Sequence, residues 1–77
     1  MKMNKKRLSE LPMGEWARVS MLMSNRDLRR RLLDIGLSPG TRVRCVGKSP
    51  LGDPRAYFVR GVRIAIRQSD ADKVIIE

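Results

Sequence analysis

Few side chains in this sequence could carry out catalysis. The chain has no histidine, the commonest general base, and a single cysteine, Cys45. Cys45 lies on the apolar side of a predicted strand, which favours a buried, unreactive thiol over a nucleophile. Gly47-Lys48-Ser49 is like the end of a phosphate-binding loop, but that motif needs a glycine where the chain has Arg42. We therefore expect that the protein is not an enzyme.

Metal-binding side chains are also sparse. The candidate carboxylates are Asp34, Asp53, Asp70 and Asp72. None of them has a recognised metal-site spacing with a histidine or cysteine. Met21 and Met23 share one face of a predicted strand, which is more typical of a protein core than of a soft-metal site. The sequence predicts no metal site and no cofactor.

Arginines and a leucine form a candidate contact patch. Arg29, Arg30 and Arg31 precede Leu33, and Asp27 stands four residues before Arg31, in the order that favours an ion pair on a helix. Such a basic run is typical of a solvated helix face. It is also typical of a protein-binding patch with Leu33 as its apolar centre and Arg29 and Arg30 as its rim. Both interpretations stay open at this point.

A short helix must position this patch. Asn25, or Ser24 before it, can cap the helix, because either side-chain oxygen can accept from the free amides of the first turn. The apolar residues recur at helical spacing, and they are Leu28, Leu32 and Ile35.

Gly36 stands where a helix commonly ends on a left-handed residue, and Leu37 follows as its hydrophobic contact. Pro39 and Gly40 then favour a tight turn. A second loop is predicted at residues 48–54, which contain Pro50, Gly52 and Pro54. At its tip, Leu51 is our candidate for an exposed apolar contact.

Alternating patterns predict about five strands, at residues 15–23, 41–47, 55–59, 62–67 and 74–76. In the first strand, Ala17, Val19, Met21 and Met23 fall on one side, and Trp16, Arg18, Ser20 and Leu22 on the other. Arg60-Gly61 predicts a two-residue hairpin. The fold class is therefore mainly β, a small barrel with one helix inserted between the first two predicted strands.

The composition limits the partners and the compartment. The net charge is +9, and residues 1–7 contribute four of these charges without an acid. We expect residues 1–7 to be a basic, flexible tail and residues 8–77 to be the folded domain. A chain this basic should bind nucleic acid, anionic lipid or an acidic protein surface. It has neither a secretory signal nor an apolar run of the ~18 residues that a membrane helix needs, which predicts a cytoplasmic protein.

Two motifs resemble a known family. Residues 32–40, Leu-Leu-Asp-Ile-Gly-Leu-Ser-Pro-Gly, resemble the helix-end signature of FeoA, a small cytosolic component of bacterial ferrous iron uptake. Pro50-Leu51-Gly52-Asp53-Pro54 resembles the loop after the next strand in that family. Residues 11–14, 63–67 and 71–76 also fit, so the resemblance covers nearly all of residues 8–77.

The resemblance implies an SH3-like barrel, related to the C-terminal domain of DtxR-type metal-dependent repressors. It implies a cytoplasmic protein that supports FeoB, the membrane ferrous iron transporter with a GTP-binding domain. Such a partner would recruit the protein to the inner face of the membrane. The family is often described as metal-associated, but a chain without histidine offers no ligand set for that role.

We weigh two functions. The first is an interaction module that contacts FeoB through the helix face and the Leu51 loop. The alternative is a basic barrel that binds RNA or DNA, which the net charge supports. Against the alternative, Trp16, Tyr57 and Phe58 are few and scattered in the sequence, so they promise no stacking surface for bases.

Overall fold

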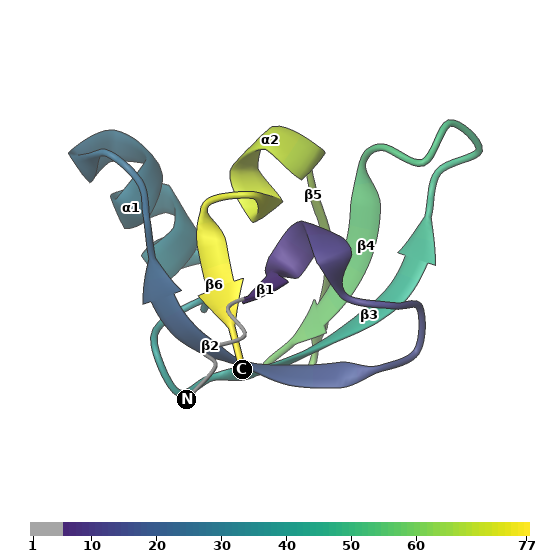
Figure 1. Cartoon of the computed structure of the whole chain (residues 1–77), viewed down its shortest axis with the longest axis horizontal. Helices are drawn as coiled ribbons and strands as arrows, with labels where there is room; N and C mark the ends of the chain where they lie inside the picture. Colours follow the sequence, from purple (N-terminus) through teal and green to yellow (C-terminus); the bar gives the residue numbers. More distant parts are fainter. Residues whose placement is uncertain (1–5) are drawn as a thin grey trace, which may run out of the picture.

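Six antiparallel strands form one sheet in a computed structural model that describes residues 6–77 (Figure 1). Their order across the sheet is β1-β6-β2-β3-β4-β5. The elements are β1 (Lys6–Arg7), a 3-10 turn η1 (Leu8–Glu10), β2 (Trp16–Leu22), α1 (Arg26–Asp34), β3 (Arg42–Lys48), β4 (Arg55–Val59), β5 (Val62–Ile66), α2 (Gln68–Ala71) and β6 (Val74–Ile76). The prediction of a mainly β fold with α1 between the strands now labelled β2 and β3 is confirmed.

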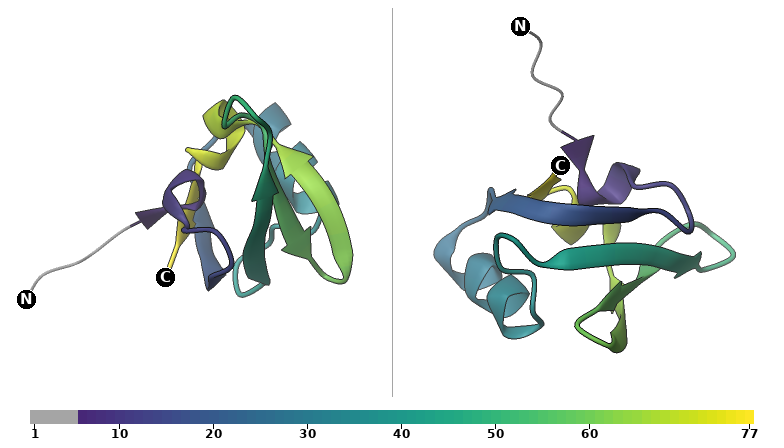
Figure 2. Two further views of the ribbon diagram at one scale, coloured as in Figure 1. Left: turned by 90° about the vertical axis from the view of Figure 1, so that its right-hand side faces the viewer. Right: turned by 90° about the horizontal axis from the view of Figure 1, so that it is seen from below.

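Strand β2 connects the two halves of the sheet. Its first residues pair with β3, and its last residues pair with β6. The sheet therefore bends along β2, with β2 and β6 on one side of the interior and β3, β4 and β5 on the other (Figure 2). The buried core between them consists mainly of Leu8, Val19, Leu32, Leu37, Val43, Cys45, Tyr57, Val59 and Val74.

Strand β1 was not expected. Lys6 pairs with Ile76 and Arg7 with Ile75, so these two residues belong to the sheet and not to a flexible tail. The remainder of the predicted tail, residues 1–5, lies outside the described residues.

A register shift in β2 reverses part of the predicted alternation. Val19 pairs with Ile76 and Met21 with Ile75, so one extra residue separates the two pairs. Beyond this bulge Leu22 points into the core, while Met21 and Met23 are 43% and 55% exposed. The prediction that Met21 and Met23 belong to the core is wrong.

Helix α1 begins as predicted. The side chain of Asn25, and not that of Ser24, caps it, because Asn25 Oδ1 accepts a hydrogen bond of 2.9 Å from the amide of Leu28. Ile35 was expected on the buried face, but the helix ends at Asp34, and Ile35, the capping residue, is 41% exposed. Leu37 is fully buried instead.

The end of α1 is a Schellman motif. The amide of Leu37 donates to the carbonyl of Leu32 at 2.9 Å, and the amide of Gly36 donates to that of Leu33 at 3.0 Å. Gly36 has a φ of 102°, which an L residue rarely adopts. The sequence signals for the end of the helix are thus confirmed.

Two tight turns also follow the prediction. The amide of Thr41 donates to the carbonyl of Ser38 at 3.0 Å across Pro39 and Gly40. Gly40 has a φ of 92°. The Arg60-Gly61 hairpin has positive φ at both residues, as a type I′ turn requires. The Arg60 guanidinium donates to Ser38 Oγ and Thr41 Oγ1, both at 3.2 Å, which fixes this turn against the Pro39-Gly40 turn.

Candidate interaction surfaces

The described residues offer little for catalysis. Cys45 is fully buried, with its Sγ 3.0 Å from an Arg55 guanidinium nitrogen. Burial raises the pKa of the Tyr57 hydroxyl above its ordinary value, while the neighbouring Arg55 lowers it by a smaller amount. Within residues 6–77, no three side chains of the metal-binding types His, Cys, Asp or Glu come together. Nor does any helix in this range have the length and apolar composition to cross a membrane.

The predicted patch on α1 is at the surface. Arg29 and Arg30 are exposed, and Leu33 is 38% exposed. Leu33 follows Arg30 by three residues and Arg29 by four, so both arginines are its neighbours on the helix. The helix buries its other side, where Leu32 is 2% exposed. Leu33 is therefore exposed beside two exposed arginines, and the role of these residues as a contact stays a prediction.

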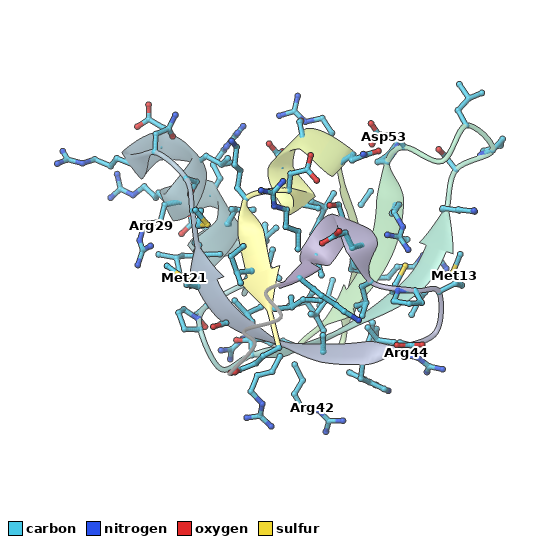
Figure 3. All side chains as sticks on the ribbon, in the orientation of Figure 1. Met13, Met21, Arg29, Arg42, Arg44 and Asp53 are labelled. Carbon is cyan, nitrogen blue, oxygen red and sulfur yellow. The ribbon has the colours of Figure 1, made fainter. Side chains whose placement is uncertain are left out.

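Two exposed methionines, Met21 near the end of β2 and Met23 just after it, face the start of α1. Met21, Met23 and Leu28 line one hollow between the end of β2 and α1. The Arg29 guanidinium donates to the carbonyl of Leu22, the residue after Met21, at 3.4 Å, and Figure 3 shows Arg29 and Met21 at the end of the molecule where α1 lies. We name Met21, Met23, Leu28, Arg29, Arg30 and Leu33 the α1 surface. Sequence reasoning missed its methionines, because only the bulge in β2 brings them to the surface.

The second predicted contact lies elsewhere. Leu51 is 94% exposed at the tip of the β3–β4 loop. Figure 1 shows this loop and α1 at opposite ends of the molecule, so the structure does not bring Leu51 and Leu33 together. The loop is held by hydrogen bonds from Gly52 N to Ser49 O at 2.8 Å and from Ser49 N to Pro54 O at 3.1 Å.

Asp53 in this loop has a structural role. Its carboxylate accepts a hydrogen bond of 2.9 Å from the amide of Gln68, the first residue of α2. The capping residue Arg67 makes no side-chain hydrogen bond to this helical turn, so the cap comes from the loop between Pro50 and Pro54. A carboxylate at a helix start also complements the helix dipole.

A third surface joins aromatic rings and arginines. Trp16 lies opposite Arg44 in the ladder of β2 and β3, and Arg44 lies opposite Phe58 in that of β3 and β4. The Trp16 and Phe58 rings meet edge to face, with 6.4 Å between their centroids. Trp16 and Phe58, although far apart in the sequence, thus lie together at the surface, whereas Tyr57 is buried in the core.

Comparison with known proteins identifies relatives for nearly the whole chain. The family model described as the FeoA domain matches residues 6–77. The Fe(2+) transport protein A/Fe(2+) transporter FeoB fusion protein of Porphyromonas gingivalis is 32% identical over 71 residues, which are 92% of this chain and 8% of the fusion protein. The chain thus corresponds to a small part of that relative.

Solved structures agree with this match. The crystal structure of Stenotrophomonas maltophilia FeoA complexed with zinc is 36% identical, with a TM-score of 0.82 over 94% of this chain and 89% of that one. A FeoA-like protein from Clostridium acetobutylicum is 29% identical, with a TM-score of 0.89 over 99% and 88%. The T. acidophilum IdeR structure, at 22% identity, shares the fold over 35% of its own length, with a TM-score of 0.83.

Proposed function

The chain belongs to the FeoA domain family, whose members take part in ferrous iron transport, and on this premise we propose that it is a non-enzymatic accessory protein that binds the cytoplasmic side of the FeoB transporter. The observation that carries this proposal is the fusion protein of Porphyromonas gingivalis. There, a segment 32% identical to this chain is part of the same polypeptide as FeoB. A covalent link keeps two modules at a high effective concentration, and a separate chain must achieve the same association by binding.

The α1 surface is the contact that we assign to FeoB. It combines exposed apolar side chains, Met21, Met23 and Leu33, with the exposed arginines Arg29 and Arg30. Protein interfaces typically have such an apolar centre inside a polar rim, and methionine and arginine are enriched in them. The Leu51 loop is a separate candidate contact, because it lies at the other end of the molecule.

A binding titration tests this function. The protein is titrated against purified FeoB in detergent at moderate salt, with and without guanine nucleotide. We expect saturable binding that Leu33→Glu weakens by more than about tenfold, because a charge would be buried at the centre of the interface. Leu51→Glu tests the second contact in the same way.

Met13→Glu is the matched control, because Met13 is 49% exposed and lies outside both candidate contacts. All three variants should keep the melting temperature of the parent chain, since the replaced side chains are at the surface. Absence of saturable binding would refute the proposed function. Binding that survives both Leu33→Glu and Leu51→Glu would place the contact elsewhere on the molecule.

A further inference from the structure

The outer side of the β2–β5 sheet carries a cationic surface that the FeoB contact leaves unused. We propose that this surface binds an anionic phospholipid bilayer. The cross-strand pairs Trp16–Arg44, Arg44–Phe58 and Phe58–Arg63 form one row across the four strands. Residues in direct register point to the same side of a sheet, and Arg42 joins them because it is two residues from Arg44. We name Trp16, Arg42, Arg44, Phe58 and Arg63 the arginine face.

The arginines of this face have no acidic neighbours within the sheet. None of the residues in β2, β3, β4 and β5 is an aspartate or a glutamate. Glu15 precedes β2, and Glu77 pairs with Arg18 through the backbone, so the nearest acids lie at the edge of the face. In residues 6–77 the one ion pair within 4.0 Å joins Arg67 to Asp70, outside the arginine face. The positive charge is therefore free to attract an anionic surface.

The exposed rings favour a bilayer as the source of that negative charge. Trp16 is 45% exposed and Phe58 is 37% exposed. Tryptophan is enriched at the level of lipid headgroups, where its ring contacts the acyl boundary and its N–H remains in a polar layer. Arginines around the rings can bind the phosphates of the same layer, and each basic residue near an anionic leaflet adds to the attraction.

The same geometry disfavours nucleic acid. Binding of single strands relies on aromatic faces that are free to stack with bases. Here the guanidinium carbons of Arg42 and Arg44 lie 4.8 Å and 5.7 Å from the centroid of the Trp16 ring, and Phe58 meets that ring with its planes at 84°. A base would have to displace these neighbours. A lipid phosphate would need only the outward edges of the guanidinium groups.

A hollow beside the rings can hold a headgroup. It has a volume of about 570 Å³ and is lined on its cationic side by Arg42 and Arg60. Arg60 is held in place by hydrogen bonds to Ser38 and Thr41. Figure 3 shows Arg42 and Arg44 projecting from the sheet away from the helices and from Asp53. A bilayer on this side would therefore leave the α1 surface and the Leu51 loop free for a protein partner.

Vesicle binding tests the proposal without FeoB, so its result is independent of the proposed function. The full chain is mixed with phosphatidylcholine vesicles and with vesicles of phosphatidylcholine and phosphatidylglycerol in equal amounts. Binding is measured by flotation and by the emission of Trp16, the one tryptophan of the chain. We expect binding to the anionic vesicles alone, with a blue shift as the indole leaves water.

Two double variants locate the binding. In Arg42→Gln/Arg63→Gln the face loses two charges, and no hydrogen bond within residues 6–77 is donated by either side chain, so the fold should be kept. We expect affinity for anionic vesicles to fall roughly 25-fold, since each of the two arginines near the leaflet contributes about fivefold. The matched control, Arg26→Gln/Arg31→Gln, removes the same charge from exposed positions on α1 and should change the affinity by less than about threefold.

Four results would overturn the proposal. The first is absence of binding to anionic vesicles at low salt. The second is an equal loss of affinity in the two double variants, and the third is binding without a shift in Trp16 emission, because either would indicate a general attraction of net charge. The fourth is tight binding of a single-stranded oligonucleotide that quenches Trp16 and removes the protein from the vesicles, which would make this face a nucleic-acid surface.

Discussion

The α1 surface and the arginine face use the same cation in opposite arrangements. On the α1 surface, Arg29 and Arg30 stand beside exposed apolar side chains such as Leu33. On the arginine face, Arg44 itself occupies the centre, between Trp16 and Phe58. Helical spacing produces the first arrangement and alternation along paired strands produces the second. Arginine content alone therefore does not show what a surface binds, and its position relative to the apolar groups is needed.

This difference predicts different responses to salt. An apolar centre loses little affinity as salt rises, while binding by a layer of guanidinium groups is screened. Arg60 and Gly36 belong to neither surface, but the hydrogen bond of 3.4 Å from Arg60 Nε to the carbonyl of Gly36 ties the hairpin between β4 and β5 to the end of α1. We therefore expect substitutions in one surface to leave binding by the other unchanged.

The largest effect on the free energy of unfolding is expected just after the bulge in β2, where the side chains that face the core change. Leu22→Ala should lower the free energy of unfolding by about 3 kcal/mol, because Leu22 is 5% exposed in the core. Met21→Ala should change it by less than about 0.5 kcal/mol, since Met21 belongs to the α1 surface. Chemical denaturation of the two variants measures this contrast. The reverse order would mean that β2 has no bulge and that Met21 is absent from the α1 surface.

Gly36→Ala tests the contact between the end of α1 and the Arg60 hairpin. An added Cβ would lie 3.1 Å from Arg60 Cδ and 3.2 Å from Val59 Cγ1, at a φ of 102°. We expect a loss of about 2 kcal/mol in the free energy of unfolding, from backbone strain together with crowding.

Gly40→Ala is the control for this prediction. Gly40 has a φ of 92° and open space around it, so the substitution adds strain without crowding and should cost about 1 kcal/mol. Thermal denaturation compares the two variants. Equal losses would show that the contact between Gly36 and the Arg60 hairpin does not restrain the helix end.

Local signals in the sequence predicted both ends of α1 and the hairpin between β4 and β5. The Asn25 cap, the Gly36 helix end and the Arg60-Gly61 turn each depend on a few consecutive residues, and all three are confirmed. The exposed positions of Leu33 and Leu51 also follow from such local patterns. Their proposed roles as contacts stay predictions.

Features that depend on strand pairing could not be predicted in this way. The bulge that exposes Met21 arises from pairing with β6, at the other end of the chain. The contact between Trp16 and Phe58 depends on the pairing register of β2 with β3 and also on that of β3 with β4. Alternation assigns a residue to one side of its own strand, but it does not show which residue lies opposite. The arginine face therefore appears only when the strands are assembled.

A smaller effect is expected at the start of α1. Asn25→Ala removes the hydrogen bond to the amide of Leu28 and should cost about 1 kcal/mol. The buried hydroxyl of Ser24 has no hydrogen-bond partner among residues 6–77, so Ser24→Ala should cost nothing measurable. Chemical denaturation measures the change in stability of each variant. Vesicle binding should be equal in the two variants. A vesicle defect in Asn25→Ala would contradict the separation of the two surfaces.

The smallest effect is on the pH dependence of stability, and it concerns Tyr57 on the inner side of β4. Because burial raises the pKa of Tyr57, the folded state keeps this hydroxyl protonated at a pH where the unfolded chain, with a tyrosine pKa of about 10, ionises. The contribution of Tyr57 to stability is complete below pH about 10 and is lost as the pH rises further. Tyr57→Phe should flatten this alkaline slope, although it also loses the hydrogen bond to the Leu8 carbonyl at 3.3 Å. Chemical denaturation at a series of alkaline pH values measures the slope in the two proteins. An equal slope in the parent chain and in Tyr57→Phe would contradict the assignment of this pH dependence to Tyr57.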